Sequence, residues 1–294
     1  MRSGAGRSLN ATRHEIHRMT HAAERWRYFS AMVEPLLIDG RRAWLKQYGD
    51  THSRRTVLRL LDRVATGLDM AALKPPPHHV GEQARQTEAR RLDELRRQHV
   101  RVPQVLGQGR HSLILEDLGP SLASHLRDAA NDAERVDRLV GAAIEAIRRV
   151  HAQGAYLGQP VPRNITFDGR DVGFIDFEED PLEVMELPHA QARDWLMFAY
   201  GTARYYDERP LRFTEVLREG LLMEASGVNA QVHHVAGRLQ GLARVSRRLG
   251  RSARALAHAI FVMHAATSFS LLFGIVLLMD WISDGDLDLL TALV

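Results

Sequence analysis

The chain of 294 residues contains no cysteine. Disulfide bonds, thiolate chemistry and zinc or iron–sulfur sites held by cysteine are therefore excluded. Charge of one sign is not in large excess either: 39 lysine and arginine residues face 36 aspartate and glutamate residues, a net charge of +3. General affinity for nucleic acid needs basic charge gathered on one face. We therefore expect no nucleic-acid partner.

The first thirty residues are polar, rich in arginine and histidine, and contain no apolar core region. We therefore expect no signal peptide and a cytoplasmic protein. The composition is that of a globular protein, with 45% hydrophobic and 26% charged residues. A chain of this length can bury a sizeable core, either as one large domain or as two small lobes.

Strands are predicted mainly in the first part of the chain. Residues 35–48 contain two β-prone runs on either side of Asp39-Gly40, a pair that favours a hairpin turn. Short strands are also predicted at 102–106 and 112–116, on either side of a turn that contains glycine. These runs indicate a small β-containing unit.

Apolar residues at helical spacing predict two helices among these strands, at 53–73 and 82–98. Three prolines at 75–77 end the first helix, and the arginine-rich stretch 85–97 of the second is expected to be a solvated face. From Ser121 onward most of the chain is predicted to be helical, at 121–130, 133–153, 190–206, 213–225 and 232–249. A strand-rich part followed by a helix-rich part indicates an α+β organisation in two lobes.

Residues that suit a nucleoside triphosphate are spread along the sequence. Asn164 and Asp176 bracket a predicted hairpin at 165–175, which would bring two hard oxygen ligands for magnesium to one point. Lys46 on the second strand could enter a cleft and bind phosphates, and Glu88 on the following helix could orient it. Taken singly, Lys46 could be a solvated edge residue, Glu88 a charge on an exposed face and Asn164 a turn cap.

In this order, the segments resemble the kinase-like superfamily, and in particular its small atypical bacterial branch. That branch includes the lipopolysaccharide core and Kdo kinases, the aminoglycoside and choline phosphotransferases and the KEOPS-associated small kinases. The resemblance runs from about Leu36 to Tyr206 and is carried by motifs whose order and spacing count for more than any single match. The motifs are Lys46, Glu88, the linker Leu113–Gly119, the His151-x-x-Gly154 turn, Asn164, Ile175–Glu178 and Arg193-Asp194-Trp195.

The resemblance implies a two-lobed protein-kinase-like fold that binds ATP and Mg²⁺ between its lobes. After a leader at 1–25, the small strand-containing N-lobe would span 26–118 and the helical C-lobe 119–255, followed by a hydrophobic helix and tail at 256–294. The backbone of Glu116 and Leu118 would hold the adenine edge.

The resemblance also implies a role for each motif residue. Lys46 would bind the inner phosphates and would be oriented by Glu88. Asn164 and Asp176 would ligate Mg²⁺. Asp194, on a buried helix, would brace the catalytic loop.

Two departures from the family pattern affect catalysis more than nucleotide binding. The family's His-Gly-Asp, whose aspartate accepts the proton of the substrate hydroxyl, is Leu157-Gly158-Gln159 here. Glutamine cannot take up this proton, although it can still position the hydroxyl. The glycine-rich loop that covers the phosphates is also missing, because 30–35 contains no glycine. The acids Glu178, Glu179 and Asp180 are expected to be solvated or paired rather than substitute bases.

The sequence thus predicts a kinase-like phosphotransferase that transfers phosphate from ATP to a hydroxyl of a lipid-linked saccharide, a small molecule or a protein. Because the base is replaced by Gln159, the alternative is a pseudokinase that binds nucleotide or acts as a scaffold without turnover. A third interpretation is a membrane-anchored interaction protein that binds no nucleotide.

The run Ala259–Met279 contains no aspartate, glutamate, lysine or arginine, and its 21 residues would just span a hydrocarbon core. Six arginines precede it and four aspartates follow it, a bias that places the preceding body on the cytoplasmic side, with Trp281 at an interface. We therefore expect attachment to the cytoplasmic face of the inner membrane. An interfacial helix and a buried helix of the C-lobe are the alternatives, because four polar residues weaken the hydropathy.

Overall fold

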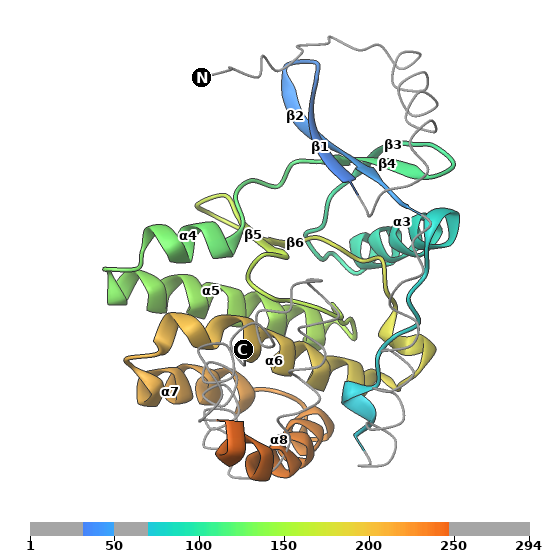
Figure 1. The fold of residues 1–294 in the computed structure, drawn as a ribbon. Coiled ribbons are helices and arrows are strands. Elements are labelled where there is room, and N and C mark those ends of the chain that lie inside the picture. The colour runs from blue at the N-terminus through green and yellow to red at the C-terminus, as the bar shows by residue number, and fades with distance from the viewer. Residues whose placement is uncertain (1–31, 50–69, 247–294) are drawn as a thin grey trace, which may run out of the picture.

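The computed structural model describes residues 32–49 and 70–246 (Figure 1). The chain forms an α+β structure, in which an N-terminal four-stranded antiparallel sheet precedes a mostly helical region. The predicted α+β class is therefore confirmed. The predicted leader at 1–25, most of the helix expected at 53–73 and the apolar run at 259–279 lie outside the described residues.

The sheet has the order β1-β2-β4-β3, and each neighbouring pair is antiparallel. The strands are β1 (Met32–Ile38), β2 (Arg41–Gln47), β3 (Val105–Gln108) and β4 (Ser112–Glu116). Asp39 and Gly40 connect β1 to β2 with φ angles of 49° and 73°, as a tight hairpin turn requires. In the register of β2 with β4, Lys46 lies opposite Leu113, so this lysine belongs to an inner strand of the sheet.

A helix packs against the sheet, and the remaining helices form the other end of the molecule (Figure 1). Helix α3 (Gly81–Arg97) contacts β4, and α6 (Leu187–Ala203) contacts α5, α7 and α8 in the helical region. The remaining elements are η2 (Ala71–Leu73), α4 (Leu122–Asp128), α5 (Ala133–Ala152), β5 (Ile165–Phe167), β6 (Val172–Phe174), η3 (Pro181–Glu183), η4 (Arg204–Tyr206), α7 (Pro210–Leu221) and α8 (Ser226–Ser246).

The predicted hairpin after Asn164 is present as β5 and β6, which pair antiparallel between the sheet and the helices. The predicted element types agree with the structure in this region, although β3 begins three residues later than expected and α8 begins six residues earlier. Most residues of α6 are buried, including Trp195 with no exposed surface. Within the described ranges, no helix is both long and apolar enough to cross a membrane.

Two helical glycines provide a test of how closely the helices pack. A Cβ atom on Gly220 of α7 would lie 2.6 Å from Cγ2 of Ile144 and 2.7 Å from Cη2 of Trp195, whereas one on Gly141 of α5 would meet nothing within 4 Å. We expect Gly220→Ala to lower the free energy of unfolding by about 1–3 kcal/mol through overpacking. Gly141→Ala should raise it by up to about 1 kcal/mol, because alanine favours the helix. Denaturant unfolding of both variants measures the difference, and equal stabilities would contradict this packing.

Candidate active site around Lys46

The Lys46 ammonium is buried among three carboxylates. Its Nζ lies 2.8 Å from Oε2 of Glu88, 2.7 Å from Oδ1 of Asp176 and 2.8 Å from Oε1 of Glu178, and only 9% of the lysine side chain is exposed. The lysine comes from β2, Glu88 from α3, and the two other acids from the segment after β6. Three segments that are distant in the sequence therefore meet at the Lys46 ammonium.

Strand alternation explains why Lys46 faces this cluster. Ala43 and Leu45 belong to a small apolar cluster with Ile114, so Lys46 and Tyr48 project from the opposite face. The Tyr48 hydroxyl donates to Oε2 of Glu88 at 2.7 Å. The same β-strand face thus supplies both a cation and a hydroxyl donor to the glutamate of α3.

Glu88 is 1% exposed, and its two carboxylate oxygens together have three polar partners. Oε2 contacts Lys46 and Tyr48, and Oε1 accepts from the backbone N–H of Phe177 at 3.4 Å. A buried carboxylate is costly without such partners. The glutamate therefore fixes α3 both to the sheet and to the segment that follows β6.

The site holds more negative than positive charge. Burial lowers the pKa of Lys46, but Asp176, Glu88 and Glu178 outweigh burial and raise this pKa well above its usual value, so the lysine stays charged. Lys46 lowers the pKa of Asp176, with a further contribution from a hydrogen bond to Asn164. Burial raises the pKa of Glu178. The Arg163 guanidinium also lowers the pKa of Asp176, so two cations act on the three carboxylates of this site.

Asp176 and Asn164 meet next to the Lys46 cluster. The backbone N–H of Ile175 donates to the carbonyl of Asn164 at 2.9 Å, so the β5–β6 hairpin returns the chain to its starting point. Asp176 has a φ of 73°, a left-handed conformation that is uncommon for residues other than glycine, and 41% of its side chain is exposed.

These oxygens fit a magnesium ion. Carboxylate oxygens of Glu88, Asp176 and Glu178 lie within 4.8 Å of one another, and Asp176 is the most exposed of these three side chains. In proteins, Mg²⁺ binds hard oxygen ligands of this kind. It usually uses one or two carboxylates together with substrate phosphates. Of the two magnesium ligands predicted from the sequence, Asn164 and Asp176, only Asp176 belongs to this group of carboxylates.

A second cluster fixes the loop that carries Gln159. Asp194, fully buried on α6, accepts from the backbone N–H groups of Leu157 and Gly158, both at 2.6 Å. The neighbouring Arg193 donates from Nε to the carbonyl of Gly158 at 3.1 Å. The Gln159 carbonyl accepts from Nδ2 of Asn164 at 3.1 Å. The loop backbone is therefore anchored on α6 and tied to a candidate metal ligand.

His151 links Asp194 to the far side of the helical region. Its Nε2 lies 3.1 Å from Oδ2 of Asp194 and its Nδ1 lies 2.9 Å from Oε1 of Glu224, and its side chain is 2% exposed. Glu224 also accepts from Nε1 of Trp195 at 3.1 Å. Burial lowers the pKa of His151, but the two carboxylates outweigh burial and raise it to about 9.

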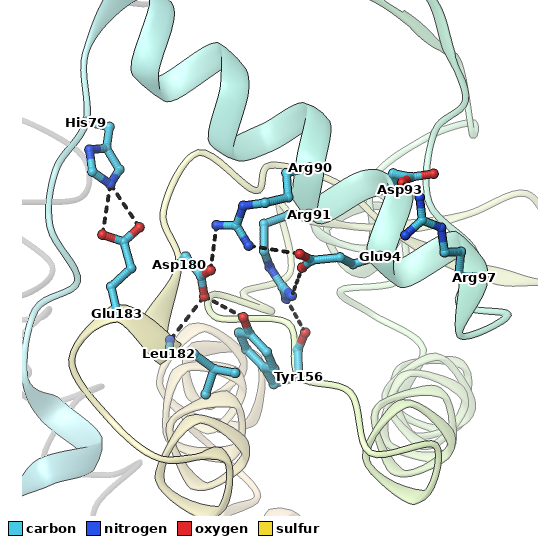
Figure 2. A network of polar contacts seen from close by, with 10 residues as sticks. All are labelled: His79, Arg90, Arg91, Asp93, Glu94, Arg97, Tyr156, Asp180, Leu182 and Glu183. Carbon is cyan, nitrogen blue, oxygen red and sulfur yellow. Dashed lines mark hydrogen bonds and ion pairs between the residues drawn. The ribbon is translucent and has the colours of Figure 1, made fainter.

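The arginines of α3 hold the opposite side of the same loop (Figure 2). Arg91 donates from Nη2 to the carbonyl of Tyr156 at 2.7 Å, and its guanidinium lies 3.8 Å from the centre of the Tyr156 ring. Arg90 donates from Nη2 to Oδ2 of Asp180 at 2.7 Å, and the hydroxyl of Tyr156 donates to the other oxygen of Asp180. The expectation that 85–97 is a solvated face is wrong for Arg91, which is 2% exposed because its stem and head pack under the loop.

The linker after β4 leads from the sheet to α4 of the helical region (Figure 1). The Glu116 N–H donates to the carbonyl of Gln104 at 3.0 Å, so only its carbonyl oxygen could receive an adenine amino group. Asp117 accepts from Nε1 of Trp44 at 3.1 Å and from the N–H of Gly119 at 3.0 Å. These bonds hold the linker around Leu118 against β2.

The structure thus brings Lys46, Glu88 and Asp176 into direct contact and places Asn164 beside Asp176. Glu116 and Leu118 lie on the linker, away from these contacts. No role in the site was predicted for Tyr48, Glu178, Arg91 or Glu224. Tyr48 could have been found, since a residue two positions after Lys46 on a strand shares its face. The others depend on contacts between distant segments.

Comparisons with known proteins leave the assignment to the geometry of the site. No protein-family model matches the chain, and the search of the curated proteins found no match.

The position of His151 generates a prediction about pH. Because its pKa rises from 6.5 to about 9 on folding, the charged ring contributes stability that is fully present below pH 6.5 and is lost as the pH rises through about 9. We expect the difference in unfolding free energy between the wild type and His151→Gln to shrink by about 3 kcal/mol from about pH 6 to pH 10. Urea unfolding across this range measures it, and a constant difference would contradict a charged His151.

Proposed function

We propose that the protein is a kinase-like phosphotransferase with a two-lobed fold, which binds Mg-ATP between its sheet and its helical region and transfers phosphate to a hydroxyl group. The observation that carries the proposal is the meeting of Lys46, Glu88 and Asp176 from three distant segments. A cation for phosphates, a carboxylate that orients it and an exposed carboxylate for magnesium are what such chemistry requires.

Each residue has a distinct task in this proposal. The three N–H donors of Lys46 each have a carboxylate within reach, so a phosphate oxygen would replace one of them. Asp176 is the partner to be released, because it is the most exposed of the three. Mg²⁺ would neutralise charge on the phosphates, and Asn164 and Asp176 would hold it. Glu88 would keep Lys46 in place.

A pseudokinase is the second candidate, and Gln159 is the observation that favours it. A glutamine at this position supplies no carboxylate to the acceptor hydroxyl. General-base catalysis contributes roughly 10²–10⁴-fold, whereas positioning and charge neutralisation supply most of phosphoryl transfer. The substitution therefore lowers the expected rate without removing the groups that bind nucleotide.

Binding of Mg-ATP is tested by thermal unfolding. Nucleotide at about 100 times its Kd should stabilise the wild type by about 2.7 kcal/mol, which corresponds to a rise of roughly 5–10 °C in Tm for a domain of this size. Asp176→Ala should abolish most of this rise, because it removes a magnesium ligand. Differential scanning calorimetry with ATP, with and without Mg²⁺, measures both.

The matched control is Asp171→Ala, an exposed carboxylate at the turn of the same hairpin. It should retain the full Mg-ATP shift. Absence of a shift in the wild type, or an equal shift in wild type and Asp176→Ala, would overturn the proposed nucleotide site. Transfer of labelled phosphate from ATP to a panel of saccharide, small-molecule and protein acceptors then separates a kinase from a pseudokinase, provided that Asp176→Ala abolishes the transfer.

We also propose that the acceptor is presented at the cytoplasmic face of the inner membrane. The apolar run Ala259–Met279 and the six arginines before it support this proposal: Arg238, Arg244, Arg247, Arg248, Arg251 and Arg254.

Membrane attachment is tested with vesicles that contain anionic lipids. The full chain should sediment with them, and a chain ending before Ala257 should stay in the supernatant. A full chain carrying Leu272→Glu and Val276→Glu keeps the tail but interrupts its apolar run. It should also bind the vesicles weakly, because charges in an apolar segment oppose insertion. Equal sedimentation of all three proteins would contradict attachment through this run.

A further inference from the structure

A hydroxyl that attacks a phosphoryl group must lose its proton, and Gln159 cannot accept it. A carboxylate lies beside this glutamine. Nε2 of Gln159 donates to Oε2 of Glu179 at 3.4 Å. A hydroxyl that hydrogen-bonds the Gln159 amide is therefore within one further hydrogen-bond length of a carboxylate oxygen.

We propose that Glu179 is the general base of the reaction and that Gln159 orients it and the acceptor hydroxyl. This inference rests on the proposed function. In the family pattern one aspartate both positions the hydroxyl and takes its proton. In this chain the two tasks are divided between an amide on the loop and a carboxylate on the segment after β6.

Glu179 has the environment that a base needs. Its side chain is 24% exposed, so an acceptor can reach it, and its second oxygen lies 3.5 Å from Nδ1 of His78. The buried Arg193, which also holds the carbonyl of Gly158, attracts the Glu179 charge. Its contacts with Gln159 and His78 are long, at 3.4 and 3.5 Å, so they hold the carboxylate only weakly.

The segment around Glu179 is held on both sides. Before it, Phe177 is 2% exposed and its N–H donates to Glu88. After it, Asp180 is 4% exposed and accepts from Arg90, Tyr156 and the N–H of Leu182 (Figure 2). A base must be fixed by supporting contacts of this kind to work.

Close packing joins this segment to the loop that carries Gln159. Gly158 has a φ of 94°, and a Cβ atom there would lie 3.3 Å from Cγ of Pro181. Only the smallest residue lets the loop come so near to Pro181. The approach brings Gln159 and Glu179 together although they come from different segments.

The neighbouring acids are unsuited to the same task. Glu178 is paired with the Lys46 ammonium at 2.8 Å. Asp180 is engaged with Arg90 at 2.7 Å, with Tyr156 and with a backbone N–H. Glu179 makes longer contacts than these two acids, 3.4 Å to Nε2 of Gln159 and 3.5 Å to Nδ1 of His78.

The proposed step balances in atoms and electrons. The O–H bond of the acceptor breaks and its proton passes to the Glu179 carboxylate. The acceptor oxygen forms a bond to the γ-phosphorus of ATP, and the bond from that phosphorus to the bridging oxygen breaks. The electron pair leaves with ADP, and Glu179 later returns its proton to solvent.

The test uses the full chain with Mg-ATP, and water serves as the acceptor, so that release of labelled phosphate gives kcat and KM. Glu179→Gln should lower kcat roughly 10²-fold or more while the KM for ATP and the Mg-ATP shift in Tm stay unchanged. Glu183→Gln is the matched control, because Glu183 contacts His79 at 2.9 Å much as Glu179 contacts His78. This control should keep wild-type kcat.

A second variant separates a chemical role from a structural one. Adding Gln159→Asp to Glu179→Gln places a carboxylate on the loop, and it should restore kcat at least about tenfold over Glu179→Gln alone. A kcat of Glu179→Gln equal to that of Glu183→Gln, or no restoration by Gln159→Asp, would overturn the inference.

Failure of the inference can be told from failure of the proposed function. If Mg-ATP raises the Tm of the wild type but no phosphate is released, the nucleotide site stands and Glu179 is not a general base. A wild type that gains no Tm removes the nucleotide site itself.

Discussion

The burial of one ammonium group constrains the rest of the structure. Removing an ion from water costs several kcal/mol even after the protein relaxes, and only well-placed partners offset that cost. Lys46 finds its partners on α3 and on the segment after β6, both distant in sequence. The sheet, α3 and the β5–β6 hairpin can therefore take only arrangements in which these segments converge on β2. The Lys46 site therefore forms only when the chain folds so that these segments meet.

Helix α3 transmits this constraint to the loop that carries Gln159. Glu88 faces Lys46, and three residues later, almost one turn along the same helix, Arg91 holds the carbonyl of Tyr156. Asp194 holds the next two residues of the loop from α6. A shift of α3 would thus disturb the cation and the loop together. In the proposed function, phosphate binding and acceptor positioning would share this one support.

Local patterns in the sequence predict the types of the described helices and strands, and part of the candidate site. The Asp39-Gly40 pair predicts its hairpin because few other pairs adopt the required φ angles, and the spacing of Asn164 and Asp176 predicts that they meet across a second hairpin. Arg91 was predicted on a solvated face and is buried, since an arginine-rich helix gives no local sign of which arginine packs under another segment. The ties of Glu224 to His151 and Trp195 likewise span more than twenty residues.

Gln159, where the resemblance to the kinase-like pattern calls for an aspartate, looks decisive in the sequence because the loop is considered alone. In the folded chain the same position adjoins a second segment, and Gly158 allows that segment to approach. What matters for proton transfer is a carboxylate within reach of the acceptor, whichever segment supplies it. For the proposed reaction, the contact between Gln159 and Glu179 therefore bears on catalysis as much as the identity of residue 159 does.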